Sequence, residues 1–186
     1  MKQSGNQKKR SVFLDRDGVL IESKIENGKP IAISHHRDVN LLGGVIEAIA
    51  LLMEADYELV VVTNQPDISR GSLSWMELEN IHAEISKSTK LNSFFVCPHT
   101  DSDSCMCRKP MPGLLLRAAK DLDLDLGKSY LVGDRWRDIE AGQAVGCNCF
   151  FIDYNYADRE PTRPFRKVES LLHAAKIILS ERNLVA

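Results

Sequence analysis

Hydrophobic and polar residues follow two alternating patterns along the chain. Short apolar runs rich in β-branched side chains predict buried strands, and the clearest is Leu-Val-Val-Val at residues 59–62. The longer stretches between these runs have the pattern of helices. The predicted strands are residues 11–14, 59–62, 94–97, 129–132 and 149–152, and the predicted helices are residues 45–54, 75–87, 113–121, 139–145 and 169–181.

This alternation predicts an α/β fold. Strands that alternate with helices are joined by right-handed crossovers, which give a parallel sheet with helices on both faces. We therefore expect a Rossmann-like, doubly wound parallel sheet. The length of 186 residues fits one domain. That domain is predicted to span residues 11–186, after a flexible, basic N-terminal tail at residues 1–10.

One segment interrupts the alternation. Residues 21–42 separate the first predicted strand from the first predicted helix and have weak periodicity. A loop this long inside a compact domain is usually functional. Within it, Gly28-Lys29-Pro30 predicts a turn. We expect the segment to form a small flap over the mouth of a site, because it is too short for a separate cap domain.

Composition and charge argue against several classes of protein. The formal net charge of -2 gives no reason to expect a nucleic acid or an anionic membrane as partner. No apolar run approaches the ~20 residues that a membrane-spanning helix needs. Residues 1–10 lack the apolar stretch of a signal peptide. We therefore expect a cytoplasmic monomer with no nucleic-acid or membrane partner.

Side chains that can carry chemistry follow four of the predicted strands. The carboxyl ends of parallel strands share one edge of a sheet, where ligands bind. Clustered carboxylates repel one another unless a cation lies between them, and hard oxygen ligands favour Mg²⁺. The residues are Asp15, Arg16 and Asp17 after the first strand, Thr63 and Asn64 after the second, Arg108 and Lys109 after the third, and Asp134 and Asp138 after the fourth.

These groups predict phosphoryl transfer. Asp15 can attack phosphorus as a nucleophile, while Asp17 can protonate the leaving oxygen and later activate water. Thr63 offers a hydroxyl to phosphoryl oxygens, and Lys109 adds positive charge ahead of a helix N-terminus. The predicted Mg²⁺ ligands are Asp15, Asp17 and Asp134, with Asp138 either ligating the metal or holding its surroundings. Each residue also has an ordinary structural reading, as a turn residue, a strand end, a helix cap or a surface charge.

The cysteines indicate a metal more than a disulfide framework. Their number is odd, at five. Cys97, Cys105 and Cys107 crowd into one short stretch with His99. Such clustering is typical of a metal site in a reducing compartment. The alternative is a set of buried free thiols beside a surface histidine.

Four motifs, in this order, resemble the haloacid dehalogenase superfamily of phosphohydrolases. They are Asp15-x-Asp17-Gly18-Val19, Thr63-Asn64, Lys109 and Gly133-Asp134-x-x-x-Asp138. The resemblance spans about residues 11–153 and implies a Mg²⁺-dependent phosphatase that forms an aspartyl-phosphate on Asp15. An acid at position 17 is typical of the phosphatases and phosphomutases of the superfamily, and the mutases usually carry a larger cap.

Three further segments resemble a narrower family, the zinc-loop heptose bisphosphate phosphatases and the related histidinol-phosphate phosphatases. The segments are residues 13–18, residues 61–65 with Arg70-Gly71, and Cys97-Pro98-His99 leading to residues 105–110. In that family a zinc-stapled loop replaces a cap domain. The implied Zn²⁺ ligands, in a loop over residues 97–107, are Cys97, His99, Cys105 and Cys107. The candidate substrate contacts are Arg16, Asn64, Arg70 and Arg108.

Two departures from the family pattern concern the substrate. Only five residues separate His99 from Cys105, and Pro66-Asp67 replaces the small residues expected after Thr-Asn-Gln. The resemblance implies a small phosphorylated metabolite, first of all D-glycero-D-manno-heptose 1,7-bisphosphate, used for surface polysaccharide. Histidinol phosphate and other sugar phosphates stay open. So does a non-enzyme, a catalytically silent zinc-stapled module that binds a phosphorylated ligand.

Overall fold

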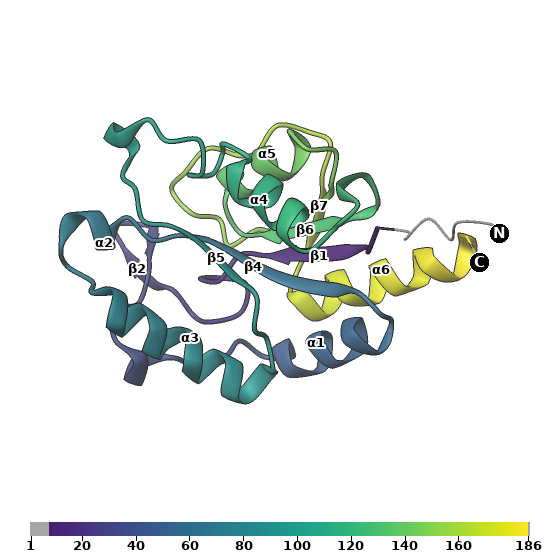
Figure 1. The fold of residues 1–186 in the computed structure, drawn as a ribbon, viewed down its shortest axis with the longest axis horizontal. Coiled ribbons are helices and arrows are strands. Elements are labelled where there is room, and N and C mark those ends of the chain that lie inside the picture. Colours follow the sequence, from purple (N-terminus) through teal and green to yellow (C-terminus); the bar gives the residue numbers. More distant parts are fainter. Residues whose placement is uncertain (1–7, 186) are drawn as a thin grey trace.

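A six-stranded parallel sheet forms the centre of the molecule (Figure 1). The structure is a computed structural model that describes residues 8–185. The strand order is β5-β4-β1-β6-β7-β8. The strands are β1 (Ser11–Leu14), β4 (Glu58–Asn64), β5 (Phe94–Cys97), β6 (Tyr130–Gly133), β7 (Asn148–Ile152) and β8 (Arg166–Val168).

Helices cover both faces of this sheet, which confirms the predicted doubly wound α/β fold (Figure 1). Within residues 8–185, no helix is long and apolar enough to cross a membrane. On one face lie α1 (Val45–Glu54), α3 (Trp75–Thr89) and α6 (Leu171–Val185), and on the other lie α4 (Gly113–Asp121) and α5 (Trp136–Gln143). The shorter elements are α2 (Asp67–Arg70) and the 3-10 turns η1 (His36–Asp38), η2 (Asp101–Asp103) and η3 (Leu126–Lys128).

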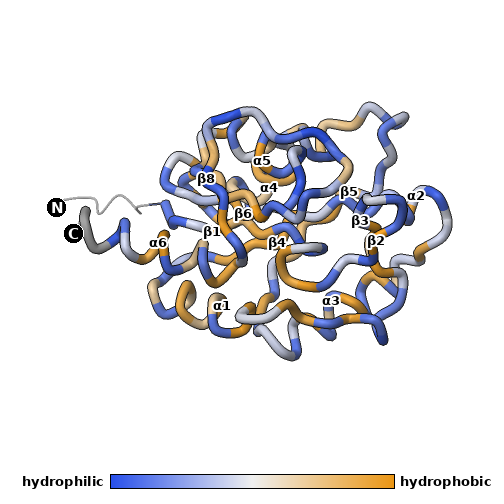
Figure 2. Tube along the Cα trace, turned by 180° about the vertical axis from the view of Figure 1, so that it is seen from behind, coloured by the Kyte–Doolittle hydropathy of each residue, from blue (hydrophilic) through white to orange (hydrophobic). Residues whose placement is uncertain are grey.

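The core is split between the two faces because successive strand residues point in opposite directions. Val12 and Leu14 of β1 belong to the cluster under α1, α3 and α6, whereas Phe13 packs into the cluster under α4 and α5. All three side chains are fully buried. Apolar segments accordingly concentrate in the middle of the molecule, around β4 and β6, and polar segments in the outer loops (Figure 2).

The connectivity places a switch point beside β1. From β1 the chain runs outward through β4 to β5 and then returns to the opposite side of β1 with β6. Ligands of open α/β sheets bind at the carboxyl ends of the strands, in the crevice at such a point. The residues that follow β1, β4 and β6 therefore face a common space.

The segment at residues 21–42 is more regular than its sequence predicts. It contains an antiparallel hairpin of β2 (Lys24–Glu26) and β3 (Lys29–Ile31). Asn27 and Gly28 form the turn with φ of 51° and 73°, the backbone that a two-residue hairpin turn requires. The predicted turn at Gly28-Lys29-Pro30 is therefore wrong in its position, because the residues after Gly28 belong to β3.

Other boundaries differ for local reasons. Helix α5 begins at Trp136, three residues before the predicted start at 139, because the Asp138 carboxylate accepts a hydrogen bond from the Arg135 N–H at 2.9 Å and caps the helix. Strand β8 was not predicted, since Arg-Lys-Val has no apolar run. Of the predicted tail, residues 1–7 lie outside the described residues, and Lys9 already forms a β-bridge with Leu124.

Gly113 sets how closely α4 approaches the loop at residues 97–107. Its N–H donates to the Met106 carbonyl at 3.0 Å, and a Cβ at this position would lie 2.2 Å from that oxygen. We expect Gly113→Ala to lower the free energy of unfolding by about 2 kcal/mol, as overpacking does. Denaturant titration measures this. Gly43→Ala is the matched control, because nothing lies within 4 Å of its Cβ position, and an equal loss in both variants would contradict the explanation.

Candidate active site

The carboxyl ends of the central strands open into a cavity of about 650 Å³. It gathers all the predicted catalytic residues and most of the predicted substrate contacts. The predicted residues that line it are Asp15, Asp17, Thr63, Asn64, Arg70, Arg108, Lys109, Asp134 and Asp138. Arg16 does not line it.

Lys109 is buried at the base of this cavity, between two carboxylates. Its Nζ donates to Asp15 Oδ1 at 2.7 Å and to the Val62 carbonyl at 2.7 Å, and it lies 2.5 Å from Asp138 Oδ1. Burial favours the neutral amine, but the charges of Asp138 and Asp15 outweigh it and raise the pKa of Lys109 above its ordinary value. The ammonium group is therefore a fixed positive charge beside Asp15.

The carboxylates have the opposite electrostatic problem. Burial raises the pKa of Asp15 to about 7; Lys109 opposes this shift, and Asp138 and Asp17 add to it. Burial, followed by the charges of Asp15 and Asp138, also raises the pKa of Asp134. Both Asp134 oxygens are buried and accept no hydrogen bond from the described residues. Such a group needs a partner that the protein itself does not supply here.

Three carboxylates could share a cation. Asp15, Asp134 and Asp138 each offer an oxygen, and these oxygens lie within 4.8 Å of one another. Hard oxygen donors with positions left open suit Mg²⁺. Asp138 is partly occupied already, since it also binds Lys109 and the Arg135 N–H. The Asp17 carboxylate, predicted as a fourth ligand, is not part of this group.

Asp17 is instead held by neighbours on its other side. Arg16 is fully buried, and its Nε and Nη2 donate to the two Asp17 oxygens at 2.9 and 3.0 Å. Gln65 Nε2 donates to Asp17 at 3.0 Å and to the Thr63 hydroxyl at 2.8 Å. Arg16 was predicted as a substrate contact, but in this structure its contacts are those of a group that orients Asp17.

This arrangement gives a prediction for Arg16→Met, which keeps apolar volume and removes the fork. We expect the free energy of unfolding to fall by about 2 kcal/mol, since Asp17 loses a partner in a half-buried site. We also expect kcat to fall, because Asp17 loses its orientation. Denaturation and steady-state kinetics measure the two effects. The control is exposed Arg117→Met, for which a change within about 0.5 kcal/mol is ordinary. A stable, fully active Arg16→Met would refute the orienting role.

Asn64 braces the connection that carries Lys109. Its Nδ2 donates to the Lys109 carbonyl at 3.1 Å, and its Oδ1 accepts from the Lys109 N–H at 3.1 Å. Both ends of the amide are therefore engaged by the backbone. Asn64 lines the cavity, but its present contacts position Lys109.

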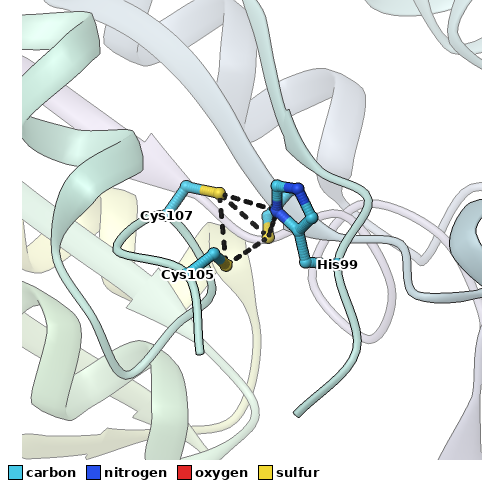
Figure 3. Close-up of side chains that lie close together, drawn as sticks. His99, Cys105 and Cys107 are labelled. Atoms are coloured by element: carbon cyan, nitrogen blue, oxygen red, sulfur yellow. Dashed lines mark hydrogen bonds between the residues drawn. The ribbon is translucent and has the colours of Figure 1, made fainter. Parts of the chain in front are cut away.

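The four predicted zinc ligands converge beside the cavity. The Sγ atoms of Cys97, Cys105 and Cys107 lie 3.2 to 3.6 Å from one another, and His99 Nδ1 lies 3.3 Å from Cys107 Sγ. Figure 3 shows His99, Cys105 and Cys107 pointing toward one another. The short span between His99 and Cys105 closes through the turn η2. Three thiols and one imidazole at these separations suit a closed tetrahedral Zn²⁺ site.

The cavity also contains residues that the sequence analysis missed. Arg135 and Arg137 flank Trp136 directly after Gly133-Asp134, so their place behind a strand end was a signal that could have identified them. Residues of the predicted flap also contribute to the wall; they are Ser23, Lys29, Pro30, Ile31 and Ala32. Closure of this flap over a ligand stays a prediction.

Known proteins share both the sequence and this fold. A family model described as HAD-hydrolase-like matches residues 106–174. A protein of Bordetella bronchiseptica named D-glycero-beta-D-manno-heptose-1,7-bisphosphate 7-phosphatase is 33% identical over 141 residues, which cover 73% of this chain and 76% of the relative. One of the same name from Pasteurella multocida is 35% identical over 152 residues, covering 74% and 77%.

Solved structures agree. The D,D-heptose 1,7-bisphosphate phosphatase of B. bronchiseptica, complexed with magnesium and phosphate, superposes with a TM-score of 0.81 at 29% identity and covers 92% of this chain and 99% of its own. The phosphatase of the same name from Burkholderia thailandensis superposes with a TM-score of 0.68 at 26% identity, covering 92% and 99%. The resemblance drawn from the motifs is thereby confirmed, and the chain belongs to the haloacid dehalogenase superfamily, in the family of the heptose 1,7-bisphosphate phosphatases.

Proposed function

We propose that this protein is a Mg²⁺-dependent phosphatase that removes the 7-phosphate from D-glycero-β-D-manno-heptose 1,7-bisphosphate. The observation that carries the proposal is the buried Asp15 carboxylate, held by Lys109 at the base of an open cavity. The names of the relatives supply the substrate. The magnesium and phosphate bound by the B. bronchiseptica structure supply the cofactor.

The residues present fit a bound Mg²⁺. Asp134 has two buried oxygens without a hydrogen-bond partner among the described residues, and Asp15 offers an oxygen nearby. In this proposal Asp15 and Asp134 hold the ion, and Asp138 supports it from the Lys109 side. When bound, Mg²⁺ would offset the repulsion between the substrate phosphate and the attacking carboxylate.

The reaction proceeds in two displacements. Asp15 attacks phosphorus, the bond from phosphorus to the sugar oxygen breaks, and Asp17 gives its proton to that oxygen. Asp17 then takes a proton from water, whose oxygen attacks the phosphorus of the aspartyl-phosphate and releases phosphate and Asp15. Lys109 and the Thr63 hydroxyl stabilise charge on the transferring group. Arg16 and Gln65 keep the Asp17 carboxyl aimed throughout.

The cysteine cluster has a positional part in this proposal. Cys107 directly precedes Arg108 and Lys109, so a Zn²⁺ held by Cys97, His99, Cys105 and Cys107 would fix the segment that delivers both cations. A structural zinc site of this composition needs no open position. The chemistry stays at Asp15.

A substrate panel tests the proposal. Phosphate release is measured with Mg²⁺ on the heptose bisphosphate, the heptose 7-phosphate, other sugar phosphates and histidinol phosphate. We expect the highest kcat/KM on the heptose bisphosphate. Preference for histidinol phosphate would replace the substrate and keep the chemistry. A folded, metal-loaded protein that releases phosphate from none of them would favour the silent binding module.

A further inference from the structure

Two arginines at the mouth of the cavity share one carboxylate. Arg108 Nε donates to Asp101 Oδ1 at 2.8 Å, and Arg137 Nη1 donates to the same oxygen at 3.0 Å. The three residues come from separate elements, since Asp101 opens η2, Arg108 follows the cysteine cluster and Arg137 lies in α5. All three line the cavity. Two guanidinium charges are thus balanced by one carboxylate.

The carboxylate is the loosest member of this group. The Asp101 side chain is 62% exposed, against 14% for Arg108 and 28% for Arg137. An exposed ion pair is worth only about 0–1 kcal/mol, so Asp101 can leave for water at small cost. The arginines have other anchors: Arg108 Nη1 donates to the His99 carbonyl at 3.1 Å, and the Arg137 Cζ lies 4.6 Å from the Trp136 ring centroid.

We propose that Arg108 and Arg137 bind the distal phosphate of a bisphosphate substrate, and that Asp101 occupies their forks until this phosphate displaces it. The inference rests on the proposed function, because the scissile phosphate must lie at Asp15. A phosphate accepts hydrogen bonds from two guanidinium forks at once, as the Asp101 carboxylate does here. Arg137 is then a residue that determines specificity, and Asp101 is an internal competitor.

This competition separates two kinds of substrate. A sugar monophosphate places its only phosphate at Asp15 and leaves the Asp101 pair intact. A bisphosphate gains contacts to both arginines and returns the Asp101 carboxylate to water. Removing an arginine should therefore lower the preference for a bisphosphate, whereas removing the Asp101 charge should raise it.

Arg137→Gln tests the first half. The ratio of kcat/KM for the heptose 1,7-bisphosphate to that for the heptose 7-phosphate should fall about tenfold, as expected for the loss of a charge-assisted hydrogen bond. Arg117→Gln is the matched control, because it removes a guanidinium that stacks on Phe95, with its Cζ 5.0 Å from the ring centroid, and does not line the cavity. An unchanged ratio in Arg137→Gln overturns the inference.

Asp101→Asn tests the second half, because it keeps the shape of the side chain and removes its charge. We expect KM for the bisphosphate to fall about threefold, in line with an exposed ion pair. The control is Asp103→Asn on the same turn, whose carboxylate binds Thr100. A rise in KM on Asp101→Asn would mean that Asp101 orients the arginines, and displacement would be refuted.

A binding measurement separates failure of this inference from failure of the proposed function. Trp136 stacks against Arg137, and Trp75 is the only other tryptophan, so Trp75→Phe makes fluorescence report on Trp136 alone. Titration with the bisphosphate and the monophosphate needs no turnover. Tighter bisphosphate binding that depends on Arg137, without phosphate release, would sink the proposed function and keep the site. Turnover with equal binding of both ligands would do the reverse.

Discussion

Asp15→Asn is expected to abolish phosphate release while the protein stays folded. Asparagine has nearly the shape of aspartate, but its amide oxygen is a poor nucleophile toward phosphorus. We expect kcat to fall by a factor on the order of 10⁴ or more, as loss of a nucleophile does in other enzymes. Phosphate release under saturating Mg²⁺ measures this. Substantial remaining activity in a well-folded variant would refute the assignment of Asp15 as nucleophile.

The same substitution has a second, independent signature in stability. The pKa of Asp15 is raised from 3.8 to about 7, mainly by burial. Its contribution to stability is therefore fully present below pH 3.8 and is lost as the pH rises through about 7. Asparagine does not titrate, so the loss of stability between pH 4 and 7 should be smaller in metal-free Asp15→Asn than in metal-free wild type. Denaturant titrations across this range measure the difference, and identical profiles would show that Asp15 carries no such shift.

The strands of the sheet were predictable because each carries a signal of its own. A run such as Leu-Val-Val-Val is apolar on both sides, and only a strand buried between two layers of helices needs that. The edge at which the catalytic side chains meet followed from the same reasoning, since parallel strands present their carboxyl ends together. Asp15, Thr63 and Asp134 accordingly line one cavity.

The partners of these side chains were not predictable, because they depend on packing between distant segments. Lys109 reads as a surface lysine in the sequence, yet it is 2% exposed and lies between Asp15 and Asp138. Arg16 reads as a substrate contact, yet it is fully buried against Asp17. A charge in a sequence has no direction, so only the fold determines whether it faces a ligand or a neighbour.

Short elements escaped prediction for a related reason. Strands β2, β3 and β8 have three residues each, too few for a period of two to be recognised. They form because a neighbour supplies the missing stabilisation. The β2–β3 turn, for example, is fixed at its tip by a hydrogen bond from the Ala157 N–H to the Gly28 carbonyl at 2.8 Å.

Cys107→Ser should have the second large effect, through loss of Zn²⁺. Cys107 Sγ contacts Cys97, His99 and Cys105, so this substitution removes one of four donors from a closed site. We expect bound zinc to fall from about one equivalent toward zero, and the free energy of unfolding to fall by about 3 kcal/mol or more, since metal binding contributes to folding. Elemental analysis and denaturant titration measure both. Cys147→Ser is the control, because that thiol is buried outside the cluster.

Activity should fall with the metal, and the pattern of the loss tests why. Lys109 binds Asp15 and Arg108 faces the mouth of the cavity, so loosening their shared segment should lower kcat and raise KM together. A change in only one would mean that the cluster positions only one of the two cations. Chelation of zinc from wild type should reproduce the defect, and restored zinc should reverse it. A Cys107→Ser protein with full activity and unchanged zinc content would show that the cysteines do not staple this loop, because a tetrahedral site does not keep its ion when a ligand is lost from a set of four.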